Sequence, residues 1–212
     1  MNGSRTLGAL LSCIALLSGC AAGNRYTYSD ARANPHFSGS GVVAVTAFDQ
    51  RPYVVSGDKT PDFVGLQRSR FGIPFDVKTD QGQPLSDDFT RVVVNSLQGA
   101  GYQAAALPAA PGDKLPAVKK RLLQNRPRRA MLLTIDEWKS DTSKNVALFY
   151  DLTLSVSSSD GSMLAQKTLK GRDDLGGTFF GSGKYAKVAV SDAFGLKMQA
   201  LLDAPEIARA LK

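Results

Sequence analysis

The 212-residue sequence has only two cysteines and one histidine, and this scarcity limits the chemistry that the chain can perform. The histidine, His36, lies in a polar N-terminal stretch, so we expect no Ser-His pair on a rigid frame. A histidine-rich metal site is excluded as well. We therefore expect no catalytic residues and no metal site, and a protein that works by binding rather than as an enzyme.

The sequence also lacks an apolar run long enough to cross a membrane, although it opens with a short one. One cation, Arg5, precedes the apolar stretch Leu7–Leu17, and the small residues Ser18 and Gly19 follow it. A membrane-spanning helix needs about 20 apolar residues. A cationic start, a short apolar core and small residues are typical of a secretory signal peptide, which we expect to occupy residues 1–19 and to be cleaved.

The residues at the expected cleavage site, Leu17-Ser18-Gly19-Cys20, resemble the lipobox of bacterial lipoproteins. The resemblance implies that the Cys20 sulfur carries a diacylglyceryl lipid, which would be the only covalent group, with no other cofactor. Cleavage would remove Cys13, so we expect neither a disulfide nor a cysteine metal site. A secreted protein with an incidental cysteine stays open as the alternative.

Sorting and charge indicate the surroundings of the mature chain. Ala21 follows the cysteine, and for a lipoprotein the absence of Asp at this position implies the outer membrane, with the body facing the periplasm. The formal net charge of +7 would otherwise suggest nucleic acid as a partner. Because the leader directs the chain out of the cytoplasm, we expect no nucleic acid, and instead a membrane bound through the lipid, anionic headgroups or acidic envelope proteins.

Residues 20–41 form the expected lipidated N-terminus and a flexible tether, because they are polar, rich in Gly, Ser and Asn, and lack any sustained period. Three aromatic residues, Tyr26, Tyr28 and Phe37, keep open the alternative of an ordered arm that lies on the domain. Residues 42–212 are the expected folded domain.

Hydrophobic periodicity divides this domain into strands and helices. The apolar run 42–48 predicts a buried strand, and residues 53–78 predict a loose hairpin or a long loop. Helical spacing predicts a helix over 85–97, with Ser86 as its N-cap. The same reasoning predicts strands at 102–107, 130–135, 146–156 and 163–170, and helices at 115–125 and 186–202, the last interrupted by Gly195.

This order of elements predicts an α+β fold, a mixed β-sheet covered by helices, in a single domain. The strand ending in Phe48-Asp49-Gln50-Arg51-Pro52, a glycine-containing loop, and the helix leading into Gly101-Tyr102 resemble the YajG-type lipoproteins of unknown function. The resemblance covers about residues 40–138. It implies a non-enzymatic envelope lipoprotein and supplies no catalytic residues.

A glycine-rich loop, residues 176–185, carries the aromatic residues Phe179, Phe180 and Tyr185. It does not have the spacing of a nucleotide-binding loop, since Thr178 stands where that loop needs glycine and Tyr185 where it needs Ser or Thr. The aromatic residues are candidates for binding a partner or a membrane interface. The alternative is that both phenylalanines tuck into the body.

The densest charge lies between residues 119 and 129, where anionic phosphates or an acidic partner would find a complementary surface. A solvated helix face is the alternative. The candidate anion-contacting residues are Lys119, Lys120, Arg126, Arg128 and Arg129.

Carboxylates complete the set of candidates. Asp49 and Arg51 are two residues apart, which favours a local ion pair that pins the following loop, and binding of a polar ligand is the alternative. Three acidic pairs, at 87–88, 136–137 and 173–174, leave a wall hydrolase as a remote alternative. The favoured function is an accessory or scaffold lipoprotein in envelope assembly, transport or cell-wall maintenance, and a binding protein for a small or lipidic ligand is the alternative.

Overall fold

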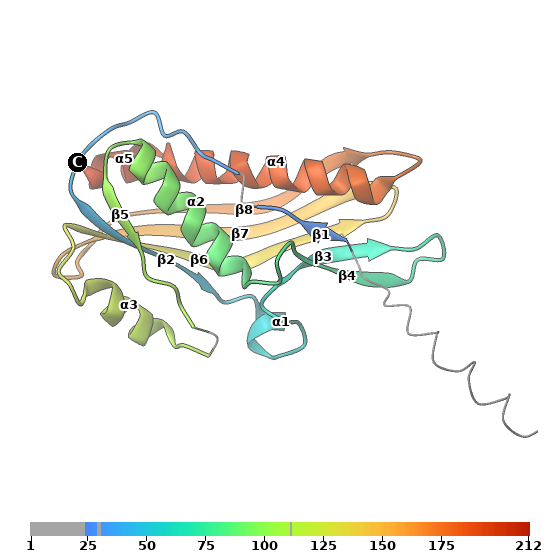
Figure 1. The fold of residues 1–212 in the computed structure, drawn as a ribbon, viewed down its shortest axis with the longest axis horizontal. Coiled ribbons are helices and arrows are strands. Elements are labelled where there is room, and N and C mark those ends of the chain that lie inside the picture. The colour runs from blue at the N-terminus through green and yellow to red at the C-terminus, as the bar shows by residue number, and fades with distance from the viewer. Residues whose placement is uncertain (1–23, 29–30, 111) are drawn as a thin grey trace, which may run out of the picture.

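A mixed eight-stranded sheet forms the centre of the computed structural model, which describes residues 24–28, 31–110 and 112–212 (Figure 1). Three long strands, β6 (Arg129–Thr142), β7 (Asn145–Ser158) and β8 (Met163–Gly177), form an antiparallel meander. The other side of β6 pairs in parallel with β2 (Val42–Asp49) and then, nearer its end, with β3 (Phe63–Arg68).

Shorter strands extend the sheet beyond β2 and β3. Strand β5 (Gln103–Ala106) pairs in parallel with β2. Strand β4 (Pro74–Thr79) forms an antiparallel hairpin with β3, and β1 (Arg25–Tyr26) pairs in parallel with β4. The described chain is thus a single α+β domain, and the fold class predicted from the sequence is confirmed.

Strand β2 is buried on both faces, which explains its almost continuous apolar sequence. Val43, Val45 and Ala47 belong to the larger core, whereas Ala44 and Phe48 belong to a smaller core on the other face. This alternation follows the two-residue period of a strand. A strand between two cores is apolar at most positions on both faces, as the sequence predicted, with Thr46 as a buried polar exception.

Helices cover both faces of the sheet. The larger core is closed by α2 (Leu85–Gly99), α4 (Ser182–Leu202) and α5 (Pro205–Leu211), and the smaller core by α3 (Leu115–Leu123) (Figure 1). A one-turn helix, α1 (Pro52–Val55), follows β2. In the part of the chain that the structure describes, no helix is both long enough and apolar enough to cross a membrane.

The N-terminal segment is an ordered arm in its described part, which corrects the prediction of a flexible tether over residues 20–41. Tyr26 and Tyr28 are fully buried, and the Tyr28 hydroxyl accepts a hydrogen bond from Trp138 Nε1 at 3.1 Å. Buried aromatic area holds the arm on the domain, as the alternative required. Residues 20–23, 29 and 30 of this segment, including Cys20, lie outside the described residues.

The arm is also fixed at the far end of α4. The His36 backbone N–H donates to Asp203 Oδ1 at 2.7 Å, and the His36 ring nitrogen Nδ1 lies 2.6 Å from Asp203 Oδ2. Burial opposes ionisation of this carboxyl, but hydrogen bonds from His36 and Gln199 outweigh it and lower the pKa of Asp203. The only histidine of the sequence therefore lies on the folded body and not in a free tether.

The predicted elements are present, with different ends. Strand β6 runs on to Thr142 because Trp138, Ser140 and Thr142 face inward beyond a register shift after Ile135. Helix α4 continues through Gly195 without interruption. Ser86 is not the N-cap of α2: Pro84 occupies that position, and Ser86 is buried in the first turn.

Candidate functional site

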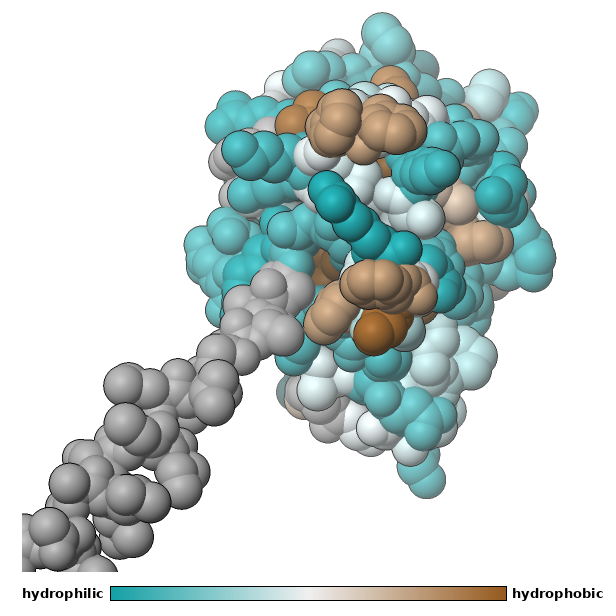
Figure 2. Space-filling view, turned by 90° about the vertical axis from the view of Figure 1, so that its right-hand side faces the viewer, coloured by the Kyte–Doolittle hydropathy of each residue, from teal (hydrophilic) through white to brown (hydrophobic). Residues whose placement is uncertain are grey.

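Three loops gather at one end of the sheet, which we call the loop end: residues 69–73 between β3 and β4, 143–144 between β6 and β7, and 178–181 between β8 and α4. Their proximity follows from strand register, because Gln67 pairs with Thr142 and Asn145 pairs with Gly177. Figure 2 faces this end and shows two groups of hydrophobic side chains with hydrophilic side chains between them.

Phe179 and Phe180 form one of the exposed aromatic groups of the loop end. Their exposed fractions are 80% and 76%, so the alternative that both tuck into the body is wrong. Their rings meet edge to face at a centroid distance of 5.0 Å, and Lys144 Nζ lies 5.9 Å from the Phe179 ring. Large apolar side chains held in solvent by a loop are typical of a contact surface.

Tyr185, the third candidate on this loop, has a structural contact. Its hydroxyl donates to the Leu175 carbonyl oxygen at 2.6 Å, which ties the first turn of α4 to the end of β8. Gly181, at φ 73°, turns the chain into the helix in a conformation that favours glycine. Tyr185 thus holds the loop that carries the two phenylalanines and is itself only partly exposed.

The turn between β3 and β4 supplies a second apolar group, which the sequence reasoning missed. Phe71 is 91% exposed and Ile73 is 57% exposed, the first value being the highest for a large hydrophobic residue in the described chain. Gly72, at φ 79°, forms the turn. An apolar residue on each side of a turn glycine, next to Arg70, is the signal that would have found it.

The structure divides the basic segment in two. Lys119 and Lys120 are exposed on α3, and Arg126 is exposed on the loop that follows. Arg129 Nε instead donates to the Ala210 carbonyl oxygen at 2.5 Å, and Arg128 donates to the carbonyl of Lys212. Cations at the C-terminal end of a helix stabilise it, so the two arginines hold α5 in place.

Arg51 and Asp49 form the predicted ion pair, and the structure adds that the pair is buried, which their spacing does not indicate. The Arg51 side chain is fully buried, and its Nε and Nη2 atoms donate to the Asp49 carboxylate at 2.9 and 2.6 Å. The other guanidinium N–H groups donate to the carbonyl oxygens of Pro61, Phe63 and Trp138. The pair joins β2, β3 and β6 and is a structural element of the core.

In each acidic pair one carboxylate has a structural partner: Arg91 pairs with Asp88, the Tyr53 hydroxyl donates to Glu137, and Lys197 pairs with Asp173. The buried Asp88 carboxylate accepts Gln83 Nε2 at 2.9 Å and pairs with Arg91, while burial raises the pKa of Asp88. Burial also raises the pKa of Asp136, and the negative charge of Asp151 adds to this shift. Among residues 24–28, 31–110 and 112–212, no three His, Cys, Asp or Glu side chains gather closely enough to hold a metal ion.

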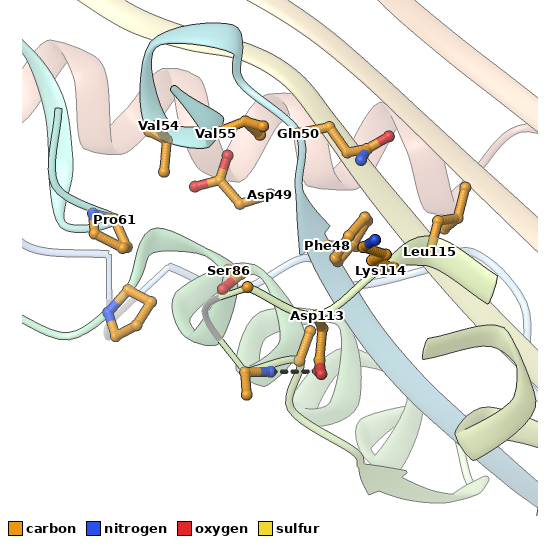
Figure 3. Close-up of a pocket in the computed structure, with 14 residues that line it drawn as sticks. Phe48, Asp49, Gln50, Val54, Val55, Pro61, Ser86, Asp113, Lys114 and Leu115 are labelled. Carbon is orange, nitrogen blue, oxygen red and sulfur yellow. Dashed lines mark hydrogen bonds between the residues drawn. The ribbon is translucent and has the colours of Figure 1, made fainter. Parts of the chain in front are cut away.

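A crevice of about 470 Å³ lies beyond the end of β2, and the sequence did not reveal it (Figure 3). The parallel strands β2 and β5 end here, and α2 and α3 leave on opposite faces of the sheet. Ligands of open α/β sheets bind at such carboxyl ends. The lining is mostly apolar, with Asp49, Gln50, Ser86, Asp113 and Lys114 as its polar members.

Not all of these polar groups are available to a ligand. Asp49 is committed to Arg51, and the Asp113 carboxylate accepts the Ala110 backbone N–H at 2.8 Å, the dashed line in Figure 3. Hydrogen bonds, first from Arg121 and then from Ala110, lower the pKa of Asp113. Gln50, Ser86 and Lys114 therefore remain as the polar side chains that can orient a bound molecule.

Comparison with known proteins establishes the fold. No family model matches the sequence, and no curated protein matches it. Protein XCC0632 from Xanthomonas campestris, of the DUF330 family, is similar with a TM-score of 0.58 and 14% identity over 88% of this chain and 96% of that one. At this identity the similarity shows a shared fold and nothing about activity.

Two further solved structures are less similar. The PelC dodecamer from Paraburkholderia phytofirmans has a TM-score of 0.37 and 14% identity over 79% of this chain and 93% of that one. Lipoprotein GNA1162 from Neisseria meningitidis has a TM-score of 0.34 and 13% identity over 74% of this chain and 98% of that one. The lipobox and the resemblance to YajG-type lipoproteins stay predictions from the sequence.

Proposed function

We propose that this chain is a lipoprotein anchored in the outer membrane through Cys20, with its domain in the periplasm, and that it serves as a non-enzymatic accessory or scaffold in envelope assembly, transport or cell-wall maintenance. The lipobox residues Leu17–Cys20 support the anchor. Anchoring confines the domain near the membrane and so raises its effective concentration for a membrane-bound partner.

The observation that carries a binding role is the exposed pair Phe179 and Phe180. The domain already buries two hydrophobic cores, so these side chains do not complete its interior. Tyr185 fixes their loop to β8, which lowers the entropy lost when the loop meets a partner. A loop that is tied to the end of β8 and presents apolar rings to solvent is suited to contact with a partner.

In-cell crosslinking followed by affinity purification and mass spectrometry tests the proposal. The native protein is compared with a Cys20→Ala form exported by a non-lipoprotein signal, and with Cys13→Ala, which changes only the leader and is the matched control. We expect one envelope complex to be enriched with the native and Cys13→Ala forms and lost with Cys20→Ala. Enrichment that does not depend on Cys20 would contradict an anchored accessory.

A second candidate function is supported by the crevice at the end of β2, whose mostly apolar lining suits a small or lipidic ligand. Native mass spectrometry of the purified protein should then reveal a copurifying molecule. Val54→Trp would fill the crevice and remove that molecule, whereas Val188→Trp, on the exposed face of α4, would leave it bound. The ligand role is contradicted if no bound mass is found.

A further inference from the structure

The first described residue of the arm, Asn24, lies next to the loop end, and its backbone carbonyl oxygen accepts the Lys78 N–H of β4 at 3.2 Å. Its side-chain amide donates to Gln67 at the end of β3. A Cβ atom added to Gly183, in the first turn of α4, would overlap both Asn24 and Gln67. Because Gln67 precedes the turn at 69–73 and Gly183 follows the loop at 178–181, the N-terminal segment enters the domain between the two exposed apolar groups.

This position limits where the lipid can be. Cys20 precedes Asn24 by four residues, and four extended residues span at most about 14 Å. Acyl chains on Cys20 would therefore hold the bilayer surface within that distance of Asn24. Asn24 contacts Gln67 and approaches Gly183, which flank two loops of the loop end, so the loop end is held close to the membrane.

The loop end has the side chains of a membrane interface. Phe71 is 91% exposed, and Phe179 and Phe180 are 80% and 76% exposed. Interfacial protein segments combine such apolar residues with Lys and Arg, which meet anionic headgroups. The two apolar groups are separated by hydrophilic side chains (Figure 2), so they form protruding tips rather than one continuous patch. Separate tips suit a deformable bilayer better than a protein partner, whose interface needs a closely packed apolar centre.

Charge at the loop end has one sign. Residues 66–75, 142–150 and 175–191, which form the three loops and their flanks, contain no acidic residue. Five aspartates border these segments: Asp76, Asp141, Asp151, Asp174 and Asp192. Three of them are neutralised at 2.6 Å, Asp76 by Lys59, Asp141 by Arg68 and Asp151 by Lys170. Cations near an anionic bilayer are attracted to its surface. The basic residues of these segments are Arg68, Arg70, Lys144, Lys184 and Lys187.

We propose that the loop end docks on an anionic lipid bilayer, with Phe71, Phe179 and Phe180 inserted at the interface. This inference rests on the proposed function, because the lipid on Cys20 brings the loop end to the membrane. The docking identifies lipid as the molecule that Phe179 and Phe180 contact. Docking would set one orientation of the domain, with the loop end toward the bilayer and the turn between β7 and β8, at the opposite end of the meander, away from it.

Tryptophan fluorescence of the mature protein, acylated on Cys20 and placed in vesicles, tests this orientation. The chain has one tryptophan, Trp138, which is fully buried and gives a constant background. Phe180→Trp and Phe71→Trp place a reporter at the loop end, and Met163→Trp places the matched control in an exposed position at the other end of β8. The vesicles contain phosphatidylglycerol and phosphatidylethanolamine, with or without acyl chains brominated to quench tryptophan.

We expect brominated lipid to lower the reporter fluorescence of Phe180→Trp and Phe71→Trp by about twofold, because inserted side chains reach the acyl boundary, and to leave Met163→Trp unchanged. Equal quenching of all three variants, or none, would overturn the docking. The mass of the N-terminal peptide separates the two proposals. If Cys20 is acylated and the loop end is not quenched, only the docking fails; if Cys20 is unmodified, the anchor fails and the docking fails with it.

Discussion

Replacement of Arg51 by methionine should destabilise the domain strongly, because this side chain satisfies several buried groups at once. A guanidinium has five N–H donors, and all five of those of Arg51 are used. Two bind the Asp49 carboxylate, and the others bind the carbonyl oxygens of Pro61, Phe63 and Trp138. Methionine fills a similar volume but removes all five donors, so Asp49 keeps only the backbone N–H of residue 51, at 3.1 Å, and the Trp138 carbonyl oxygen only the Tyr53 hydroxyl, at 3.3 Å.

The magnitude follows from the burial of the pair. The Asp49 side chain is 11% exposed and that of Arg51 is 0% exposed. Removal of one partner of such a pair leaves an uncompensated buried charge and typically costs about 3 to 5 kcal/mol. In a domain of this size 1 kcal/mol shifts Tm by about 2 to 4 °C, so we expect Tm to fall by roughly 6 to 20 °C.

Urea denaturation followed by the fluorescence of Trp138 measures this loss. The matched control is Arg68→Met, which removes an equally bidentate pair with Asp141, at 2.8 and 2.6 Å, whose side chains are 36% and 28% exposed. Solvent-exposed pairs contribute less than about 1 kcal/mol. Arg51→Lys should also be destabilised, since an ammonium cannot form the fork. If Arg51→Met and Arg68→Met lose equal stability, the burial argument is wrong.

Three other perturbations test separate parts of the structure. Phe179→Ser with Phe180→Ser should change Tm by less than about 2 °C in a thermal melt, because both rings are exposed. In urea titrations Gly65→Ala should lower the free energy of unfolding by about 1 to 3 kcal/mol, because the added Cβ would lie 2.8 Å from a backbone oxygen of β6. The control Gly99→Ala should not lower it, because the added Cβ meets no atom. The pKa of Asp203 is lowered in the folded state, so ionised Asp203 stabilises the fold above its unfolded pKa, near 3.9. This stabilisation is lost as the pH falls through the folded pKa. In urea titrations from about pH 5 to pH 2, the free energy of unfolding of Asp203→Asn should therefore fall less steeply than that of the unsubstituted protein.

The sequence predicted those elements in which the buried residues recur with the period of a strand or of a helix. Strand β2 was recognisable because both of its faces are buried, and α2 because Phe89, Val92 and Val93 recur on one face. The far half of β6 was missed because polar side chains such as Ser140 and Thr142 face inward there. Their burial depends on β3 and the N-terminal arm, which local periodicity does not report.

The candidate sites show the same limit. Spacing alone predicted that Asp49 pairs with Arg51, and the structure confirms it. Spacing could not predict that the pair is buried, because the carbonyl oxygens that complete it come from residues 61, 63 and 138. The loop end and the crevice are likewise assembled from segments far apart in the chain, so neither is visible in any one stretch of sequence.

The most direct test of the central claim is the mass of the N-terminal peptide of the mature protein, isolated from membranes. The account predicts that this peptide begins at Cys20 and carries a diacylglyceryl group on the sulfur. A peptide that begins elsewhere, or an unmodified Cys20, would contradict the membrane anchor on which the proposed function and the orientation of the loop end both depend.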